Sequence, residues 1–213
     1  MSAEARLREE ICSFARSIFE RGLTGGASGN ISARLPDGAL LVTPTGASFG
    51  RLDPARLARL DADFRHRDGD PPTKEMPLHS AFYATRASAG AVVHLHSTHS
   101  VALSLLPDTD PTDAIPPLTA YAVMRLGRVR LLPYFMPGDP AMGQAVRDLA
   151  GEVPAVLLAN HGPVVAAPDL AGAVYAMEEL EETARLALLT RGLSPRRLTR
   201  EQIARLEAAF PIR

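Results

Sequence analysis

The chain has 213 residues, of which 46% are hydrophobic and 22% charged, and its formal net charge is −1. This composition is typical of a globular protein with a substantial core, and the near-neutral charge argues against nucleic-acid and anionic-membrane partners. The single cysteine excludes an intramolecular disulfide, and the N-terminus has no apolar signal segment. We therefore expect a cytoplasmic protein that folds as one domain over residues 1–213.

The first half of the chain predicts a helix, two short strands and a second helix. Apolar residues recur at helical spacing over residues 3–21, behind Ser2 as a candidate N-cap. A Pro-Asp-Gly turn within residues 31–46 indicates a β-hairpin. The remaining expectations are a helical turn and strand over 52–64, a polar loop over 65–75 and a helix over 76–88.

The second half alternates strands with helices, which indicates an α/β fold. Residues 89–96 predict a short buried strand, and residues 97–106 a helix capped by Ser97 or Thr98. Further elements are expected as a helix at 119–127, a strand at 128–134, a helix at 139–151, two strands within 154–167, a helix at 169–192 capped by Asp169 and a helix at 199–210.

Three of the six histidines fall close together in the segment "VVHLHSTH". Side chains alternate along a strand, so His94 and His96 share one face, where two imidazoles can chelate one divalent cation. Such a pair on its own is more often structural. Here the strand gives way to a polar segment, which is where active sites of α/β proteins gather.

Further ligands for the same cation come from other parts of the chain. His161 follows an apolar strand and precedes Gly162, which permits a tight backbone turn behind a ligand. Glu75 opens a helix, where the helix dipole favours a carboxylate. Three histidines and a carboxylate suit Zn, Mn or Fe.

Two other histidines compete for the third histidine position. His79 lies one helical turn after Glu75, but a pair with this spacing often arises by chance. His99 lies three residues after His96 and, one turn into a helix, is expected to point away from the ligand face. We leave both outside the metal set, and the role of His99 stays open.

Small polar residues in two glycine-rich segments indicate an anion site. They are Ser28 and Asn30 in "ASGN", and Thr45 and Gly46 in "TPTG". Backbone N–H groups, hydroxyls and an amide can together hold a phosphate, and Lys74 could add a positive charge. The segments match neither the P-loop nor the dinucleotide-binding fingerprint.

Five motifs together resemble the class II aldolase and adducin family: "GLTGGASGNISAR", "LLVTPTG", "PPTKEMPLHSAFY", "VVHLHSTHSVALS" and "LLANHGPVV". They occur in the family's order and spacing, and the resemblance covers about residues 4–190. It implies a three-layer α/β/α fold around a mostly antiparallel sheet. It also implies one divalent metal ion, zinc in the first place, with manganese, iron or cobalt as alternatives. It further implies a four-fold homotetramer with sites at subunit interfaces.

The resemblance assigns roles position by position. His94, His96 and His161 match metal ligands, and Glu75 matches an acid–base carboxylate that also binds metal when substrate is absent. Positions that match or adjoin the family's substrate and phosphate contacts are Ser28, Asn30, Thr45, Gly46, Thr73, Lys74 and Tyr121.

Two of these substrate positions bear on the choice within the family. Fuculose-phosphate aldolases have a serine pair where this chain has Thr73 and Lys74, which keeps one hydroxyl and adds a charge. Tyr121 stands where the aldolases place a tyrosine that comes from a neighbouring subunit. The assignment of this role to Tyr121 is weaker for the branches other than the aldolases.

The segments "TKEMPLH", "HLHSTHSVALS" and "TAYAVMRLGRVRLLPYFMPGD" are most similar to the branch that decarboxylates 3-oxo-tetronate 4-phosphates to dihydroxyacetone phosphate and CO2. In that reaction a metal would stabilise an enediolate, and Glu75 would protonate its carbon if burial raises the Glu75 pKa. The alternatives are a class II sugar-phosphate aldolase of the fuculose-phosphate kind or a ribulose-phosphate 4-epimerase. A remote alternative is a non-enzymatic adducin-like binding module.

Overall fold

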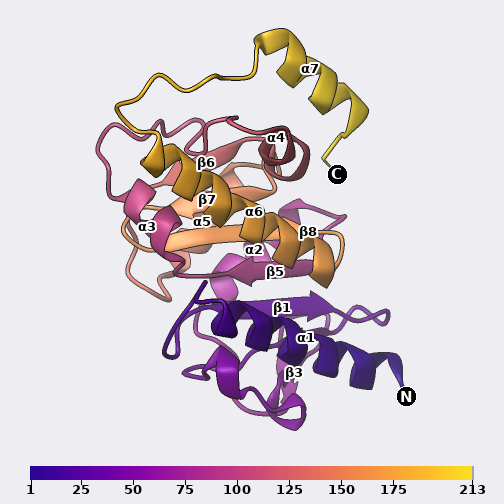
Figure 1. Ribbon diagram of the computed structural model, residues 1–213. Coiled ribbons are helices and arrows are strands. Elements are labelled where there is room, and N and C mark those ends of the chain that lie inside the picture. The colour runs from indigo at the N-terminus through magenta and orange to yellow at the C-terminus, as the bar shows by residue number, and fades with distance from the viewer. Residues whose placement is uncertain (213) are drawn as a thin grey trace.

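An eight-stranded sheet runs through the centre of the protein, in the order β4-β3-β2-β1-β5-β8-β7-β6 (Figure 1). The computed structural model describes residues 1–212. All neighbouring strands are antiparallel except β6 and β7, which confirms the mostly antiparallel sheet. The strands are β1 Asn30–Arg34, β2 Leu40–Val42, β3 Ala58–Leu60, β4 His66–Asp68, β5 Ala91–His94, β6 Val129–Leu132, β7 Ala155–Leu158 and β8 Gly162–Ala167.

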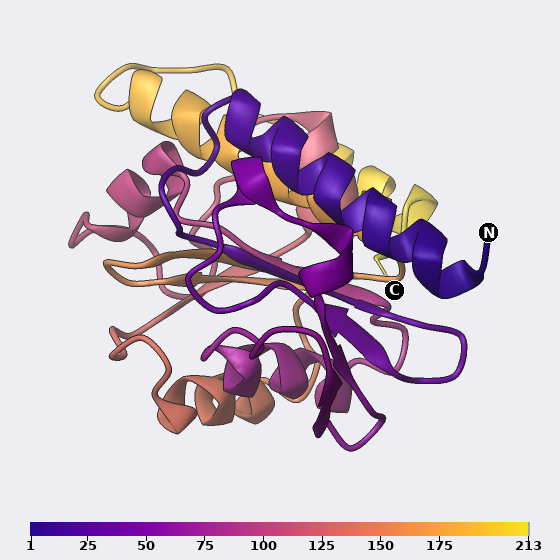
Figure 2. The ribbon, with the colours of Figure 1, turned by 90° about the horizontal axis from the view of Figure 1, so that it is seen from below.

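Helices cover both faces of this sheet, as Figure 2 shows, so the predicted three-layer α/β/α fold is confirmed. One face carries α1 Ala3–Glu20, α3 Thr98–Ser104, α4 Ala120–Leu126 and α6 Leu170–Leu189. The opposite face carries α2 Met76–Thr85 and α5 Pro140–Asp148, and α7 Arg200–Ala209 packs against α4. Among residues 1–212 no helix is both long and apolar enough to cross a bilayer.

Side chains alternate along β1 and β5, so successive residues face the two opposite layers of helices. Ile31 and Val93 point into the core beneath α1 and α6, and Val92 points into the core beneath α2 and α5. By the two-residue period of a strand, Asn30 and Ser32 on β1 point toward the α2 face. The sheet therefore presents polar side chains to α2 in the middle of an apolar layer.

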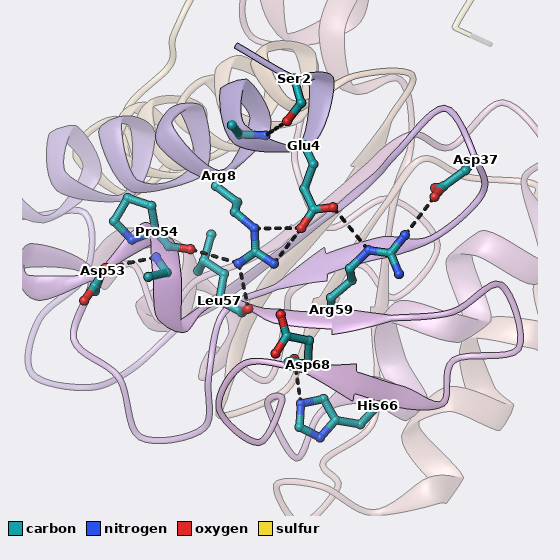
Figure 3. Close-up of polar contacts among 12 residues, drawn as sticks. Ser2, Glu4, Arg8, Asp37, Asp53, Pro54, Leu57, Arg59, His66 and Asp68 are labelled. Atoms are coloured by element: carbon teal, nitrogen blue, oxygen red, sulfur yellow. Dashed lines mark hydrogen bonds and ion pairs between the residues drawn. The ribbon is translucent and has the colours of Figure 1, made fainter.

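The N-terminal helix is tied to the outer strands by charged side chains (Figure 3). Arg8 pairs with Glu4 at 2.7 Å, and its guanidinium also donates to the carbonyls of Pro54 and Leu57 at 2.9 and 3.0 Å. Arg59 lies 3.3 Å from Glu4 and 2.8 Å from Asp37. These contacts tie α1 to residues 54–57 and to Arg59 on β3. Ser2 caps α1 through the N–H of Ala5, as predicted.

The structure differs from the sequence predictions at β4 and at the end of β5. The segment predicted as a polar loop contains β4, whose three residues are exposed and which pairs with β3 through the backbone, so its sequence shows no apolar alternation. His66 in this strand lies at the surface (Figure 3). The strand predicted to end at His96 ends at His94, because the regular ladder with β8 stops at the His94–Val164 pair.

Candidate metal centre

Four side chains from three segments converge at the ends of the central strands. Glu75 stands at the start of α2, His94 ends β5, His96 follows it by two residues, and His161 lies in the turn between β7 and β8. One ligand atom from each lies within 4.8 Å of the other three. These are the four residues that the sequence analysis groups as metal ligands.

The turn that presents His161 depends on a close backbone approach. A Cβ at Gly162 would lie 2.2 Å from the carbonyl oxygen of Leu95, so a side chain there would force β8 away from β5. Asn160 adopts a positive φ of 57° just before the histidine, and its N–H donates to the hydroxyl of Ser104 at 3.1 Å. Glycine after His161 thus brings the imidazole next to His94 and His96.

The separations of the ligand atoms suit a single small cation. His94 Nε2 lies 3.1 Å from His96 Nε2 and 3.4 Å from Glu75 Oε2, and His161 Nε2 lies 3.3 Å from Glu75 Oε1. Ligands at about 2.0–2.1 Å from a tetrahedral zinc lie roughly 3.3 Å from one another. The cluster could therefore hold a divalent metal without rearrangement of the fold.

The hydrogen bonds around the rings support the same conclusion. His94 Nδ1 lies 2.8 Å from the carbonyl oxygen of Pro163, which can only accept, so Nδ1 carries the proton and Nε2 directs a lone pair into the cluster. Both ring nitrogens of His161 are buried without a hydrogen-bond partner in the described part of the chain. A buried polar atom of this kind requires a partner, and a cation would supply one.

The protonation states also match those of metal ligands. Burial, helped by the neighbouring His96 and His161, lowers the pKa of His94 to about 3, and burial is the main cause of a lowered pKa at His96. Both rings are then neutral at pH 7, which is the form that binds metal.

Glu75 differs from the expectation that burial raises its pKa. Burial acts in that direction, but the facing rings of His161 and His94 and the amide of Asn30 outweigh it and hold the pKa below its usual value. The carboxylate is 4% exposed and charged, with Asn30 Nδ2 donating to its Oε2 at 2.7 Å. A carboxylate beside three imidazoles is a typical donor set for a divalent metal.

Two loops with predicted phosphate contacts run side by side next to Glu75. The N–H of Thr45 donates to the carbonyl of Pro71 at 3.0 Å, and the hydroxyl of Thr73 accepts from the N–H of Glu75 at 3.3 Å. Thr73 is buried, whereas the solvent-facing members of the two loops are Thr45, Gly46 and Lys74. Of these loop residues, Thr73 is the one in direct hydrogen-bond contact with a member of the cluster.

Three other predicted contact residues have different surroundings. Ser28 donates to the carbonyl of Gly25 at 2.6 Å within its own turn. Asn30 uses its amide nitrogen on Glu75 and its amide oxygen on His79, and its side chain is buried. Tyr121 on α4 is 58% exposed and lines a cavity to which none of the four cluster residues contributes.

His99 and His79 both lie outside the group of four. His99 Nδ1 lies 2.8 Å from Oε1 of Glu181, and the same carboxylate accepts from the N–H groups of His99 and Ser100. His99 therefore joins the start of α3 to α6. His79 is fully buried, with a pKa lowered by burial to about 4, and contacts Asn30 and Ser32.

Sequence analysis missed the buried polar residues Ser32 and Tyr83, whose hydroxyls are 2.9 Å apart. A signal for them exists in the pattern. Glu75, His79 and Tyr83 recur at four-residue spacing along α2, and Ser32 lies two residues after Asn30 on β1. The two spacings alone do not reveal that these side chains meet, because that depends on how β1 packs against α2.

A His/Glu cluster that could hold a metal lies at the strand ends of this α/β/α sandwich, and the chain belongs to the class II aldolase and adducin family. The family model described as Class II Aldolase and Adducin N-terminal domain matches residues 9–188. This confirms the predicted family.

Particular relatives are similar over nearly the whole chain. The chain is 48% identical over 205 residues to the 3-oxo-tetronate 4-phosphate decarboxylase of Escherichia coli strain K12. The matched region covers 96% of this chain and 97% of the relative. The crystal structure of YgbL from Escherichia coli has a TM-score of 0.94 at 47% identity, covering 96% of this chain and 99% of that one. The L-fuculose phosphate aldolase of Haemophilus influenzae is 32% identical, covering 93% and 91%.

Proposed function

We propose that this chain is a carboxy-lyase that converts a 3-oxo-tetronate 4-phosphate into dihydroxyacetone phosphate and CO2. The observation that carries this proposal is the set of buried histidines around Glu75 in a chain 48% identical to relatives of that name. Identity to the fuculose-phosphate aldolases is lower, at 32%. A phosphorylated, sugar-like substrate fits the family to which the chain belongs.

The chemistry requires one carbon–carbon bond to break and one proton to be added. The C1–C2 bond of the substrate breaks, its electron pair moves toward the C3 ketone to give an enediolate, and C1 leaves as CO2. A divalent cation held by His94, His96 and His161 would act as a Lewis acid toward the developing oxyanion. Protonation at C2 completes dihydroxyacetone phosphate, so each turnover consumes one proton.

Glu75 is the group assigned to deliver this proton. It is the only carboxylate among the four clustered side chains. The bond from Asn30 and the nearby rings stabilise its charged form, so Glu75 is a carboxylate in the free protein. It must therefore take up a proton in each cycle before it can donate one to C2.

The opposite end of the substrate requires an anion site. The adjacent loops carry the exposed residues Thr45, Gly46 and Lys74, and the buried Thr73, whose hydroxyl contacts the N–H of Glu75; we assign the phosphate to these loops. Binding the phosphate there would fix the reacting carbon relative to the cluster. Ser28 and Asn30 are assigned to the border of the same pocket.

The proposal extends to the metal, the assembly and the location. Zinc is the proposed metal, because nitrogen ligands with one carboxylate and spacings near 3.3 Å suit a tetrahedral site. The chain is taken as one domain over residues 1–213 that forms a cytoplasmic homotetramer. The exposed position of Tyr121, away from its own cluster, fits a contribution to a neighbouring subunit.

The test uses purified protein loaded with zinc or manganese and a substrate generated by a kinase in the same reaction. Dihydroxyacetone phosphate and CO2 are measured separately, with chelator and Glu75→Gln as controls. Equal release of both products, lost in both controls, is the expected result. Dihydroxyacetone phosphate from fuculose 1-phosphate would instead identify an aldolase, interconversion of pentulose phosphates an epimerase, and inactivity on all of them would contradict an enzymatic role on these substrates.

A further inference from the structure

A ladder of five buried polar side chains leads away from the metal cluster between β1 and α2. Glu75, His79 and Tyr83 lie one helical turn apart, and Asn30 and Ser32 alternate along the facing strand. Four helical residues rise about 6 Å and two strand residues about 6.7 Å, so the two series match. Each of the five side chains is at most 6% exposed.

Consecutive members of this ladder are in hydrogen-bond contact. Asn30 Nδ2 lies 2.7 Å from Glu75 Oε2, and Asn30 Oδ1 lies 2.5 Å from His79 Nε2. His79 Nδ1 lies 2.7 Å from the hydroxyl of Ser32, which lies 2.9 Å from the hydroxyl of Tyr83. The ladder is continuous from the carboxylate to the phenol.

The donor and the acceptor of every hydrogen bond in the ladder follow from the first member, Glu75. A carboxylate only accepts, so the atom of Asn30 that faces Glu75 must be the amide nitrogen. The amide oxygen then faces His79 and requires a proton on Nε2. A neutral ring has one such proton, so Nδ1 accepts from Ser32, whose oxygen accepts from Tyr83.

We propose that His79 is a positioning residue, which holds the amide of Asn30 in the one orientation that donates to Oε2 of Glu75. Its effect on catalysis rests on the proposed function, but its effect on Asn30 does not. Without the N–H of His79 the buried amide oxygen loses its donor, and only the contact with Oε2 is left to hold the amide in place.

This arrangement distinguishes the two oxygens of Glu75. Oε2 is occupied by the Asn30 amide at 2.7 Å, whereas Oε1 faces His161 at 3.3 Å. With Oε2 held by Asn30, the plane of the carboxylate and the direction of Oε1 are set by the amide. His79 would therefore control the orientation of the Glu75 carboxylate from one residue away, without touching the substrate.

The test compares His79→Leu, which removes the donor, with His79→Gln, which restores a side-chain N–H. The control is Phe82→Leu, a buried apolar change on the same helix. Loss of partners around functional groups typically costs 10–100-fold. We therefore expect His79→Leu to lower kcat at least tenfold with KM within about twofold and unchanged metal content. His79→Gln should recover part of kcat, and Phe82→Leu should keep kcat even if it unfolds more easily.

A second readout does not depend on activity. In the wild-type protein at neutral pH, long-range ¹⁵N–¹H correlations should place the His79 proton on Nε2, and Ser32→Ala should perturb that ring while it still folds. A proton on Nδ1, or an unchanged kcat in His79→Leu, would overturn the proposal. If the wild-type protein fails to decarboxylate while the proton is found on Nε2, the proposed function fails and the orientation of Asn30 stands.

Discussion

The buried ladder beside the metal cluster and the charged network beneath α1 use similar groups with different consequences. In the ladder, the His79 ring is fully buried, and both its nitrogens meet a protein partner. In the network, the Arg59 side chain is 29% exposed, and it is shared between Glu4 and Asp37 (Figure 3). Water can replace a lost partner only in the second case. The ladder therefore fixes the orientation of its side chains, whereas the network contributes only electrostatic attraction between charged groups.

The largest expected effect comes from removing a ligand inside the buried region. His161→Ala deletes a side chain whose ring nitrogens have no protein hydrogen bond, so folding should depend on it less than metal binding does. Loss of Lewis-acid stabilisation worth several kcal/mol should lower kcat about a thousandfold or more. Metal content is measured by elemental analysis of dialysed protein. His66→Ala, at an exposed histidine of β4, should leave both quantities unchanged; full metal content in His161→Ala would contradict the assignment.

Glu75→Gln should produce the next largest loss. The variant keeps an acceptor for the Asn30 amide and about the same volume, but it cannot deliver a proton. A decrease in kcat of about 10²–10⁴-fold is expected for loss of a general acid–base group. The matching change in the exposed network, Glu4→Gln, should leave kcat unchanged. Steady-state kinetics with thermal unfolding as a folding control would show whether the loss is chemical, and comparable kcat values in the two variants would refute the role of Glu75.

The difference between the regions also explains what could be predicted from the sequence. The two-residue spacing of His94 and His96 predicts that their imidazoles lie on one side, and they do although His96 follows the end of β5. Gly162 marks the turn behind His161, so the cluster is visible in the sequence. The ladder is not, because it depends on how far α2 is displaced along β1. Strand β4 was missed because its residues are exposed and its stability comes from backbone pairing.

A smaller effect is expected from Ser32→Ala, which leaves the cluster intact. The change deprives His79 Nδ1 and the Tyr83 hydroxyl of their shared partner in a buried layer. An unsatisfied buried polar group costs about 1–3 kcal/mol, so the free energy of unfolding should fall by roughly that amount. Ser48→Ala provides the comparison, because the Ser48 side chain makes no capping bond at the short helix that follows it. Equal denaturation midpoints for the two variants would show that water reaches the ladder.

The smallest effect is expected at the edge of the exposed network, with Asp37→Asn. This change keeps an oxygen to accept the turn bond from Ala39 but removes the charge that faces Arg59 at 2.8 Å. Exposed ion pairs contribute about 0.2–1 kcal/mol, and salt screens them. The difference in unfolding free energy between wild type and variant should therefore be small at low salt and shrink further near 1 M NaCl. A loss larger than that of Ser32→Ala, or one that does not respond to salt, would mean that Asp37 has a structural role that water cannot take over, and the contrast between the two regions would then fail.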